Sequence, residues 1–490
     1  MTSYTEPSDN TVPEAVTAAA TAQDAVARAS YANRATWLEA LADTLDTHAE
    51  ELVPLADTET HLGHTRLTGE LARTSAQLRL FASVVREGSF LEATIDHDDP
   101  SATPPIPDLR RMLVPLGPVA VFAAVNFPFA FSVLGGDTAS ALAAGNPVVV
   151  KAHEGHPGLS RRVAELAIGV LSESGAPAGM FGLIEGREAG VELIRHPAIR
   201  AVGFTGSVTG GRFLFDVAMQ RPDPIPFYGE LGSINPVVIT PGAAEESLDE
   251  LADGLLGSFT MGAGQFCTKP GVVFSPATAD LADHLAKRLP PAAMPLLNER
   301  IGAGFRKRLD DVIGHAGVEA RAGAQASKDD QAAPVVLRTT VRQVLDSPDA
   351  LLDEVFGPTT LVVDYDSLDD VRKLLLVLPG SLTATLHAES EEPGTAELTA
   401  DLARIAGRVL YGGWPTGVAV AHAQHHGGPY PSSTSVHTSV GTTAIRRWLR
   451  PVSYQTMPEV LLPLALQEAN PLNILRRIDG ILKLPAGSTS

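Results

Sequence analysis

The chain has 490 residues, of which 44% are hydrophobic and 19% charged, a composition typical of a globular protein of two or three domains. Its 57 acidic residues outnumber its 37 Lys and Arg residues, and the net charge of −20 disfavours nucleic acid and anionic lipid as partners. No apolar run approaches the roughly 20 residues of a membrane span, and the polar, acidic start does not resemble a signal peptide. We therefore expect a cytoplasmic protein without a membrane partner. The single cysteine excludes an internal disulfide and a multi-thiolate zinc site.

The first part of the chain predicts helices. From about Pro13 to Phe81, alanine and leucine recur at helical spacing, without the alternation of a strand. The acidic, proline-rich stretch from Asp96 to Pro107 then predicts a linker or turn.

Short apolar strands alternate with helices between about residues 115 and 220. Strands are expected at 119–124 and 147–150, in MFGLIEG and in IRAVGFTGS, and helices in GGDTASALAAG, LSRRVAELAIGVLSESG and GGRFLFDVAMQ. Such alternation predicts βαβ units and a parallel sheet. The pattern restarts after Glu230 with the strand INPVVI and the helix EESLDELADGLLGSF. We therefore expect two α/β halves that join near residue 230.

Several motifs of nucleotide and metal chemistry are absent from the sequence. The chain has no G-x-x-x-x-G-K-[ST], no H-E-x-x-H and no G-x-G-x-x-G after a strand. HAQHH places His422 and His426 four residues apart without a glutamate or a thiolate, so we favour a loop or packing role and expect no metal. The glycine-rich SVTGG after FTGS can seat a pyrophosphate, although alone this signal is weak.

Three polar residues lie in loops beside predicted strands. Cys267 lies in the short polar segment MGAGQFCTKPG, where Gly262 and Gly264 allow close approach to a ligand. Glu230 lies in the glycine-flanked FYGELGSINPVV, and Asn126, in VNFPF, ends another predicted strand. A lone cysteine is most often a small buried hydrophobe. Together with a carboxylate and an amide, however, this one supplies the parts for acyl transfer: a nucleophile, a base for water and an oxyanion donor.

Six short motifs in a fixed order resemble those of the aldehyde dehydrogenase superfamily. They are NFP at 126–128, KAHE at 151–154, FTGS at 204–207, ELG at 230–232, GQFC at 264–267 and EVFGP at 354–358. One tetrapeptide would mean little, whereas the ordered set over residues 115 to 360 is highly specific. Within the superfamily, the chain is similar to the α-ketoglutaric semialdehyde (2,5-dioxopentanoate) dehydrogenases. The segments that carry this narrower likeness include LTGELART, FYGELGSINPV, WPTGVAVAHAQHHGGPYPSSTS and GTTAIRRWLRPVSYQTMPEVLLP.

The resemblance implies NAD(P)-dependent oxidation of an aldehyde to a carboxylate through a cysteine thioester, here 2,5-dioxopentanoate to 2-oxoglutarate. It implies that Cys267 attacks the aldehyde as a thiolate, and that the Asn126 amide and the Cys267 N–H hold the oxyanion. Glu230 then activates the water that hydrolyses the thioester. Because relatives that pass the acyl group to coenzyme A usually lack such a glutamate, Glu230 favours hydrolysis.

The resemblance also assigns residues to bound NAD or NADP. They are Lys151, His153, Glu154, Gly206, Ser207, Glu354 and Phe356. Lys151 and Glu154 fall where the family holds the adenosine ribose, and His153 lies between them. Gly206 and Ser207 match the pyrophosphate turn, and Glu354 and Phe356 match the nicotinamide side. Glu154 differs from the residue that this branch often has at the same position. Because its carboxylate repels a 2′-phosphate, it favours NAD over NADP. If the Glu154 side chain points away from the ribose, Lys151 and His153 remain to bind the 2′-phosphate of NADP.

A semialdehyde with a distal carboxylate needs a cation at the mouth of its tunnel. Arg66 and Arg73, in TRLTGELART, are candidates because the corresponding helices border that tunnel in the family. A surface ion pair is the alternative for either residue. His61 is a second departure, since relatives tend to have glycine there, and it leaves a different substrate open.

The fold implied by the resemblance has three parts. They are a Rossmann-like cofactor-binding domain of residues 1–96 and 116–230, an α/β catalytic domain of residues 231–448, and a β-strand oligomerisation flap with a C-terminal tail of residues 97–115 and 449–490. Flaps of this kind are shared between subunits, so we expect a homodimer or homotetramer. The apolar LLPLALQEANPL in the tail is expected to pack against the protein.

Three other functions stay open from the sequence. The first is an aldehyde dehydrogenase for another substrate, either a long-chain aliphatic aldehyde or a semialdehyde of a specialised pathway. The second is a thiol esterase or acyltransferase that uses Cys267 without a cofactor. The third is a non-catalytic oligomeric binding protein, which would have no need of Cys267, Glu230 and Asn126 together.

Overall fold

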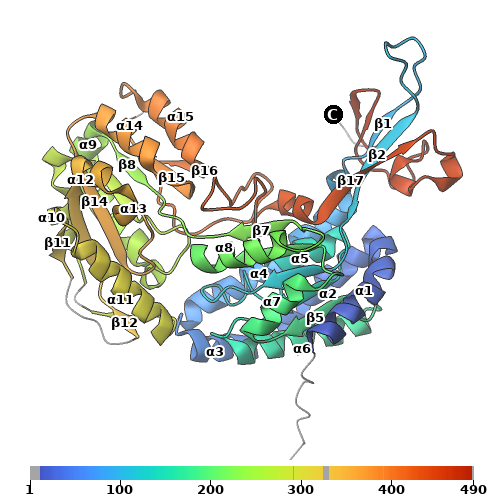
Figure 1. Cartoon of the computed structure of the whole chain (residues 1–490), viewed down its shortest axis with the longest axis horizontal. Coiled ribbons are helices and arrows are strands. Elements are labelled where there is room, and N and C mark those ends of the chain that lie inside the picture. The colour runs from blue at the N-terminus through green and yellow to red at the C-terminus, as the bar shows by residue number, and fades with distance from the viewer. Residues whose placement is uncertain (1–10, 291, 324–329, 390, 488–490) are drawn as a thin grey trace, which may run out of the picture.

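A computed structural model describes residues 11–290, 292–323, 330–389 and 391–487. The ends of the predicted domains at residues 1–10 and 488–490 lie outside these ranges. Two α/β bodies lie side by side, and a smaller sheet projects from the end of the first body (Figure 1). No helix in the described ranges is long and apolar enough to cross a membrane.

The first body contains a parallel sheet with the strand order β5-β4-β3-β6-β7. Its strands are β3 (Val119–Phe122), β4 (Val148–Lys151), β5 (Phe181–Ile184), β6 (Ala201–Thr205) and β7 (Phe227–Glu230). The helices between them are α5 (Gly136–Ala144), α6 (Pro157–Glu173), α7 (Arg187–Arg195) and α8 (Val208–Met219). The βαβ alternation expected from the sequence is therefore confirmed.

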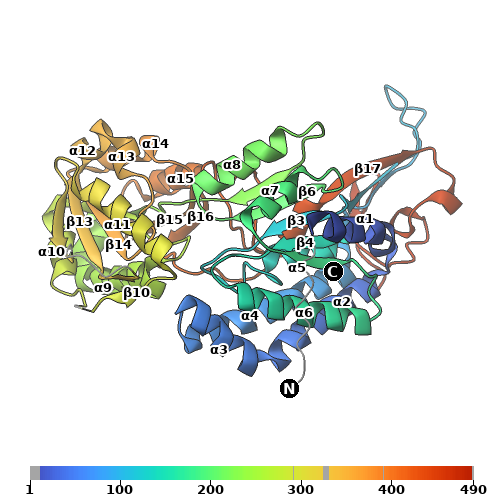
Figure 2. The same cartoon turned by 60° about the horizontal axis from the view of Figure 1, so that its bottom comes forward.

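Helices cover both faces of this sheet because its strands are apolar on both sides. Along β3, Val119 and Val121 face one hydrophobic cluster, while Ala120 and Phe122 face another. The first cluster receives helices α2, α4, α5 and α6, and the second receives α1, α7 and α8 (Figure 2). A sheet buried in this way is typical of parallel α/β proteins.

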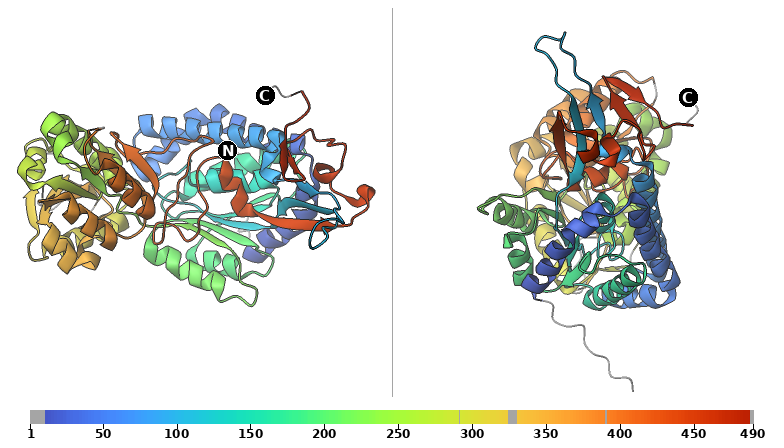
Figure 3. Two further views of the ribbon diagram at one scale, coloured as in Figure 1. Left: turned by 90° about the horizontal axis from the view of Figure 1, so that it is seen from above. Right: turned by 90° about the vertical axis from the view of Figure 1, so that its right-hand side faces the viewer.

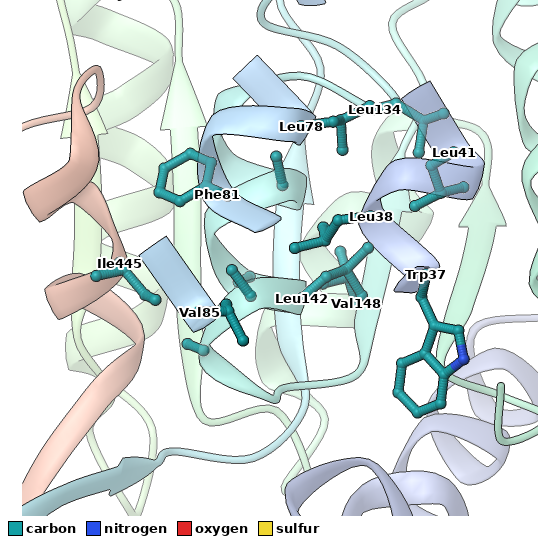
Figure 4. Close-up of a cluster of buried hydrophobic side chains, with 14 of the residues drawn as sticks. Trp37, Leu38, Leu41, Leu78, Phe81, Val85, Leu134, Leu142, Val148 and Ile445 are labelled. Atoms are coloured by element: carbon teal, nitrogen blue, oxygen red, sulfur yellow. The ribbon is translucent and has the colours of Figure 1, made fainter. Parts of the chain in front are cut away.

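The chain begins with helices, as its alanine and leucine spacing predicts. They are α1 (Val12–Arg28), α2 (Tyr31–Thr47), α3 (Ala49–Thr60) and α4 (His64–Glu87). Ser30 caps α2 by accepting a hydrogen bond from the Asn33 N–H at 3.1 Å. Leu38 of α2 and Leu78 of α4 then meet Leu142 of α5 in the core that Figure 4 draws. This packing fixes α4 against the first sheet.

The second body is built on a sheet with the order β11-β13-β14-β9-β8-β15-β16, in which β11 is antiparallel and the other strands are parallel. Its strands are β8 (Val237–Ile239), β9 (Val272–Pro276), β11 (Glu319–Ala322), β13 (Val335–Thr340), β14 (Thr359–Tyr365), β15 (Ser381–His387) and β16 (Ala406–Tyr411). The short strands β10 (Met294–Pro295) and β12 (Gln331–Ala332) pair beside it. Its α-helices are α9 (Pro241–Thr260), α10 (Leu281–Ala286), α11 (Glu299–Ile313), α12 (Val341–Asp346), α13 (Pro348–Leu351), α14 (Leu368–Val377) and α15 (Thr395–Ile405).

A third sheet projects from the first body (Figure 3). Its strands, in the order β17-β2-β1-β18-β19, are β17 (Leu449–Gln455), β2 (Leu109–Pro115), β1 (Thr94–Asp96), β18 (Arg476–Ile478) and β19 (Ile481–Lys483). Leu462 and Leu466 of the tail are buried in the core of the first body, so the tail packs as expected. Short 3-10 helices complete the elements: η1 (Ser89–Leu91), η2 (Met261–Gly264), η3 (Ala277–Ala279), η4 (Thr442–Trp448), η5 (Glu459–Leu461) and η6 (Leu464–Leu466).

The segment between β16 and β17 returns from the second body to the first. The Leu231 N–H donates to the Ser432 carbonyl at 2.8 Å, and the Thr434 N–H donates to the Gly229 carbonyl at 3.0 Å. Further on, Ile445 and Trp448 join the core of the first body. The segment therefore crosses the end of β7, where Glu230 lies. The predicted domain boundaries at 230 and 448 stay a prediction.

Candidate active site

Glu230 is the last residue of β7, at the carboxyl end of the first sheet, where α/β proteins commonly bind ligands. Its side chain is buried, and both oxygens accept hydrogen bonds. Oε1 accepts from His426 Nε2 at 2.9 Å, and Oε2 accepts from the Ser439 hydroxyl at 2.7 Å. Burial alone would raise the pKa of Glu230, but the His426 and Ser439 contacts outweigh it and the pKa is lowered. The carboxylate is therefore ionised at neutral pH.

Cys267 follows η2 in the loop after α9, and its side chain is half-buried. Gly264 has a φ of +67°, and a Cβ there would lie 2.2 Å from the Gly357 carbonyl oxygen. A Cβ at Gly262 would lie 2.7 Å from Nη1 of Arg66. The two glycines thus allow close approach to other parts of the protein, whereas the sequence suggested approach to a ligand.

The thiol of Cys267, a carboxylate oxygen of Glu230 and a ring nitrogen of His426 lie within 4.8 Å of one another. Sγ is 3.5 Å from His426 Nε2. Burial, followed by the negative charge of Glu230, raises the pKa of the Cys267 thiol well above its ordinary value. The thiol is thus protonated in this state, beside a carboxylate that can take its proton.

Asn126 lies in the loop after β3 and its side chain is buried. Its Nδ2 donates to the Gln265 carbonyl at 3.1 Å, two residues before the candidate nucleophile. Arg66 donates from Nη2 to the Asn126 carbonyl at 2.6 Å and so holds the loop in place. An amide donor is therefore positioned beside the Cys267 loop, as an oxyanion site requires.

Arg66 and Arg73 both lie on α4, but they have different surroundings. The Arg66 guanidinium lies over the rings of Phe127, at 5.0 Å, and Phe266, at 4.6 Å, in addition to its bond to the Asn126 loop. Arg73 lies 5.5 Å from the ring centre of Phe131, and its Nη1 and Nη2 are buried without a hydrogen-bond partner. Within the part of the chain that the structure describes, neither arginine forms the surface ion pair that was the alternative. Arg73 is the one with free donors near the site.

The adenosine side of the expected cofactor site lies at the end of β4. Lys151 Nζ lies 4.0 Å from the Glu154 carboxylate. Glu154 also pairs with Arg187 of α7, whose Nε lies 3.2 Å from Oε1, and Arg187 was not identified from the sequence. Burial is the main cause that lowers the pKa of His153 to about 3, so this ring is neutral at pH 7. Glu154 thus lies between two cationic side chains, Lys151 and Arg187.

Gly206 and Ser207 are exposed at the start of α8. The Ser207 hydroxyl caps the helix by accepting from the Gly210 N–H at 3.2 Å. A Cβ at Gly206 would lie 2.7 Å from the Phe204 ring. The first N–H groups of the 12-residue helix have no partner within it, so this end suits a pyrophosphate.

The nicotinamide side of the expected site is the loop from Glu354 to Pro358. A Cβ at Gly232 would lie 2.9 Å from Oε2 of Glu354, so this carboxylate packs against the ELG turn. Lys269 is fully buried and donates from Nζ to the carbonyls of Val355 at 2.7 Å and Thr359 at 2.8 Å, holding the loop from both sides. Phe356 is half-buried in the same loop. With Lys151 and the open start of α8, these groups fit a nicotinamide dinucleotide.

Sequence reasoning missed His426, Ser439, Lys269 and Arg187. His422 and His426 both lie in a loop, as expected, but His422 is exposed, while His426 is buried in the catalytic cluster. Thiol, imidazole and carboxylate are also zinc ligands, yet Nε2 here faces an oxygen that requires a proton from it. The absence of a metal stays a prediction.

The position of His426 also bears on the thiol-esterase alternative. In such enzymes one ring nitrogen takes the thiol proton while the other donates to an orienting group. Here Nε2 faces both Cys267 and Glu230, and Nδ1 is buried without a partner. The geometry is therefore not that of a cysteine–histidine hydrolase.

A thiol and an ionised carboxylate within 4.8 Å of each other are the groups of an enzyme that forms a covalent intermediate, and the comparisons with known proteins identify the class of enzyme. The family model described as "Aldehyde dehydrogenase family" matches residues 1–450, and the chain belongs to this family. The chain is therefore an oxidoreductase that acts on aldehydes with NAD or NADP.

Two curated relatives have the same activity in their names. "Alpha-ketoglutaric semialdehyde dehydrogenase 2" of Azospirillum brasilense is 47% identical over 93% of this chain and 89% of its own length. "Alpha-ketoglutaric semialdehyde dehydrogenase" of Acinetobacter baylyi is 43% identical over 92% of this chain and 87% of its own length. The likeness to this branch is thus confirmed.

Among solved structures, the NADP-dependent glyceraldehyde-3-phosphate dehydrogenase of Bacillus halodurans, complexed with NADP, matches with a TM-score of 0.77. The match covers 91% of each chain at 20% identity. This likeness confirms the aldehyde dehydrogenase fold.

Proposed function

We propose that this chain oxidises 2,5-dioxopentanoate to 2-oxoglutarate, with Cys267 as nucleophile, Glu230 as base and Asn126 as oxyanion donor. The observation that carries the proposal is the cluster of a half-buried thiol and an ionised, hydrogen-bonded carboxylate within 4.8 Å. The substrate is suggested by the two curated relatives, whose names state α-ketoglutaric semialdehyde, and by the free donors of Arg73.

The reaction begins when the Cys267 thiol passes its proton to Glu230 and the thiolate attacks the aldehyde carbon. The Asn126 amide and the Cys267 N–H donate to the resulting oxyanion. NAD or NADP, when bound, would supply the hydride acceptor, and loss of hydride from the adduct would leave a thioester on Cys267. Glu230 then releases the thiol proton to solvent and takes a proton from water, which attacks the thioester. The Cys267 thiolate leaves, and the carboxylic acid is released.

Arg73 is proposed to bind the distal carboxylate of the substrate. Its two terminal nitrogens are buried without partners, and an unpartnered buried donor costs about 1–3 kcal/mol. A carboxylate satisfies both nitrogens at once in a bidentate pair. Arg66 is proposed to position Asn126, because its Nη2 already donates to the Asn126 carbonyl.

The cofactor is proposed to lie between Lys151, Glu154 and Arg187 at its adenosine end and Glu354 and Phe356 at its nicotinamide end. Gly206 and Ser207 are proposed to face the pyrophosphate, and the neutral His153 to line the site without adding charge. The cytoplasmic location stays a prediction.

A homodimer or homotetramer is proposed, with the third sheet as its interface. Large apolar side chains of the tail are exposed there: Val460, Leu461, Leu464, Ile481, Leu482 and Leu484. Large apolar side chains exposed on one small sheet and its tail are candidates for an interaction site. Sedimentation of the whole chain tests this, and a monomer at micromolar concentration would refute it.

The test of the substrate is a panel of aldehydes with NAD and NADP, in which kcat/KM is compared for each. The panel contains 2,5-dioxopentanoate, succinate semialdehyde, uncharged pentanal and a long-chain aldehyde. Arg73→Met is expected to lower kcat/KM for 2,5-dioxopentanoate about 10- to 100-fold and to leave pentanal nearly unchanged, since one charged pair is lost.

Arg79→Met is the matched control, because Arg79 lies on the same helix, is exposed and pairs with Asp43. It is expected to leave both substrates unchanged. If a long-chain aldehyde exceeds 2,5-dioxopentanoate by more than about tenfold in kcat/KM, the proposed substrate is wrong.

A further inference from the structure

His426 places one ring nitrogen between two groups of the reaction. Its Nε2 lies 2.9 Å from Oε1 of Glu230 and 3.5 Å from Sγ of Cys267. The side chain is fully buried, so water does not compete for this nitrogen. A nitrogen at 3.5 Å is within hydrogen-bonding distance of a sulfur.

The backbone around His426 fixes this position. The His426 N–H donates to Thr438 Oγ1 at 2.8 Å, and its carbonyl accepts from the Ser439 N–H, also at 2.8 Å. The Ser439 hydroxyl then donates to the other oxygen of Glu230. His426 and Ser439 therefore each bind one oxygen of Glu230, and their two segments are hydrogen-bonded to each other.

The contacts of His426 define which nitrogen carries the proton. The Glu230 carboxylate can only accept, so Nε2 must be the donor. Nε2 thus carries a proton, which makes His426 a donor to this site and not a base.

We propose that the Nε2–H of His426 is a shared hydrogen-bond donor that stabilises the Cys267 thiolate when it forms, and that His426 is in this sense a catalytic residue. This inference rests on the proposed role of Cys267 as the nucleophile. While the sulfur is protonated, the Nε2–H of His426 donates to the Glu230 carboxylate. Once the negative charge has moved to the sulfur, the same N–H donates to the sulfur.

The proton and charge balance is simple. The thiol proton moves from Sγ to the Glu230 carboxylate, which becomes a neutral acid. Its hydrogen bond from the Nε2–H is then weaker, because the acceptor no longer carries a negative charge. The sulfur gains the negative charge and lies 3.5 Å from the same N–H. When the thiolate attacks, the charge passes to the aldehyde oxygen and the donor is free to return to Glu230. His426 itself neither gains nor loses a proton.

Other charged groups also face the thiol, but they act differently. Glu230 on β7 and Glu354 in the loop before β14 raise the pKa of Cys267, and Arg408 on β16 lowers it. Arg73 on α4 interacts with the Cys267 charge through space, and neither of its terminal nitrogens has a hydrogen-bond partner. His426 thus adds to these charges a direct hydrogen bond to the sulfur.

The test is the pH dependence of Cys267 alkylation by iodoacetamide, without aldehyde or cofactor. Because the chain has a single cysteine, the rate reports this thiol alone. A hydrogen bond to the charged thiolate lowers the pKa of the thiol. His426→Phe removes this bond and is therefore expected to shift the midpoint of the alkylation profile up by about one to two pH units. His426→Gln, which keeps an N–H donor, is expected to restore at least half of this shift.

Two controls separate the donor from packing and from indirect effects. His422→Phe makes the same substitution at the exposed histidine of HAQHH and is expected to leave the midpoint unchanged. In a Glu230→Gln background, His426→Phe is still expected to shift the midpoint, because the donor acts on the sulfur itself. Circular dichroism checks each fold, and His426→Asn, whose amide is too short, replaces the phenylalanine variant if that variant does not fold.

The proposal is overturned if the midpoint is the same in His426→Phe and the native chain, or if Phe and Gln shift it equally. It is also overturned if the shift disappears in the Glu230→Gln background. Since the assay uses no substrate, this result is independent of the aldehyde panel. Failure here leaves the proposed oxidation standing, and failure of the panel leaves the thiol chemistry standing.

Discussion

Arg187 forms an ion pair with Glu154, with Nε of the guanidinium 3.2 Å from Oε1 of the carboxylate. Lys151 Nζ lies 4.0 Å from the same oxygen, so the carboxylate lies between two cations. The expectation that Glu154 favours NAD treated this carboxylate as an isolated charge. Once it is paired, its repulsion of a 2′-phosphate is weakened and Arg187 offers a new partner.

We predict that Arg187→Ala lowers kcat/KM for NADP about fivefold relative to NAD, the value of a partly exposed charge pair. The measurement is the ratio of kcat/KM for the two cofactors at one aldehyde concentration. Arg195→Ala, at the exposed far end of the same helix, is the control. An unchanged ratio, or a ratio that moves towards NADP, would contradict this account of Glu154.

Gly264→Ala is predicted to damage catalysis more than folding. The residue has a φ of +67°, and the new Cβ would lie 2.2 Å from the Gly357 carbonyl oxygen, so the loop that holds Cys267 must move. Misplacement of a nucleophile by about 1 Å can cost about 100-fold in rate. The measurement is kcat together with the thermal midpoint.

Gly257→Ala is the matched control, because Gly257 lies within α9 and a Cβ there meets nothing within 4 Å. Alanine is also the better helix residue. If Gly264→Ala is as active as Gly257→Ala, close approach to Gly357 does not position the thiol.

Acid is predicted to destabilise the fold below about pH 6.5. Burial lowers the pKa of His387 to about 4, and it is the main cause that lowers the pKa of His153 to about 3. Both rings are neutral in the folded chain, whereas the unfolded chain binds protons below about pH 6.5. The unfolding free energy therefore falls as the pH decreases from about 6.5 towards these values.

His387→Phe removes one such group and is predicted to reduce this slope by at most about 1.4 kcal/mol per pH unit. Denaturant unfolding at several pH values between 4 and 7 measures the slope. His422→Phe, at an exposed position, is expected to leave it unchanged. An equal slope in the native chain and His387→Phe would show that His387 is not buried as a neutral ring.

The sequence predicted the parts of the fold that have regular patterns. The helices before Phe81 and the strands of the first sheet follow the spacing of their apolar residues, although β3 ends at Phe122 and not at Ala124. The motif set identified the family because Cys267, Glu230 and Asn126 each lie in a short ordered motif. Their proximity in space then follows from the fold.

The residues that the sequence missed lack such a local signal. His426 and Ser439 belong to the segment after β16, which has no periodicity and reaches Glu230 only because it crosses from the second body to the first. Arg187 begins α7 after β5, and its role depends on Glu154 at the neighbouring strand end. From the sequence alone, Lys269 is expected at the surface, because nothing in the sequence indicates the two carbonyls to which it donates. In each case the partner lies far along the chain.

The most direct test of the central claim is mass spectrometry of Glu230→Gln after rapid quenching with aldehyde and nicotinamide cofactor. Without Glu230, the Cys267 thiol can lose its proton only to solvent, so reduced cofactor should appear in a single burst that is slower than in the native chain. The acyl group should accumulate in an equal amount on the peptide that contains Cys267, because no base activates water. A burst of reduced cofactor with no acyl adduct on Cys267 would contradict the thioester mechanism.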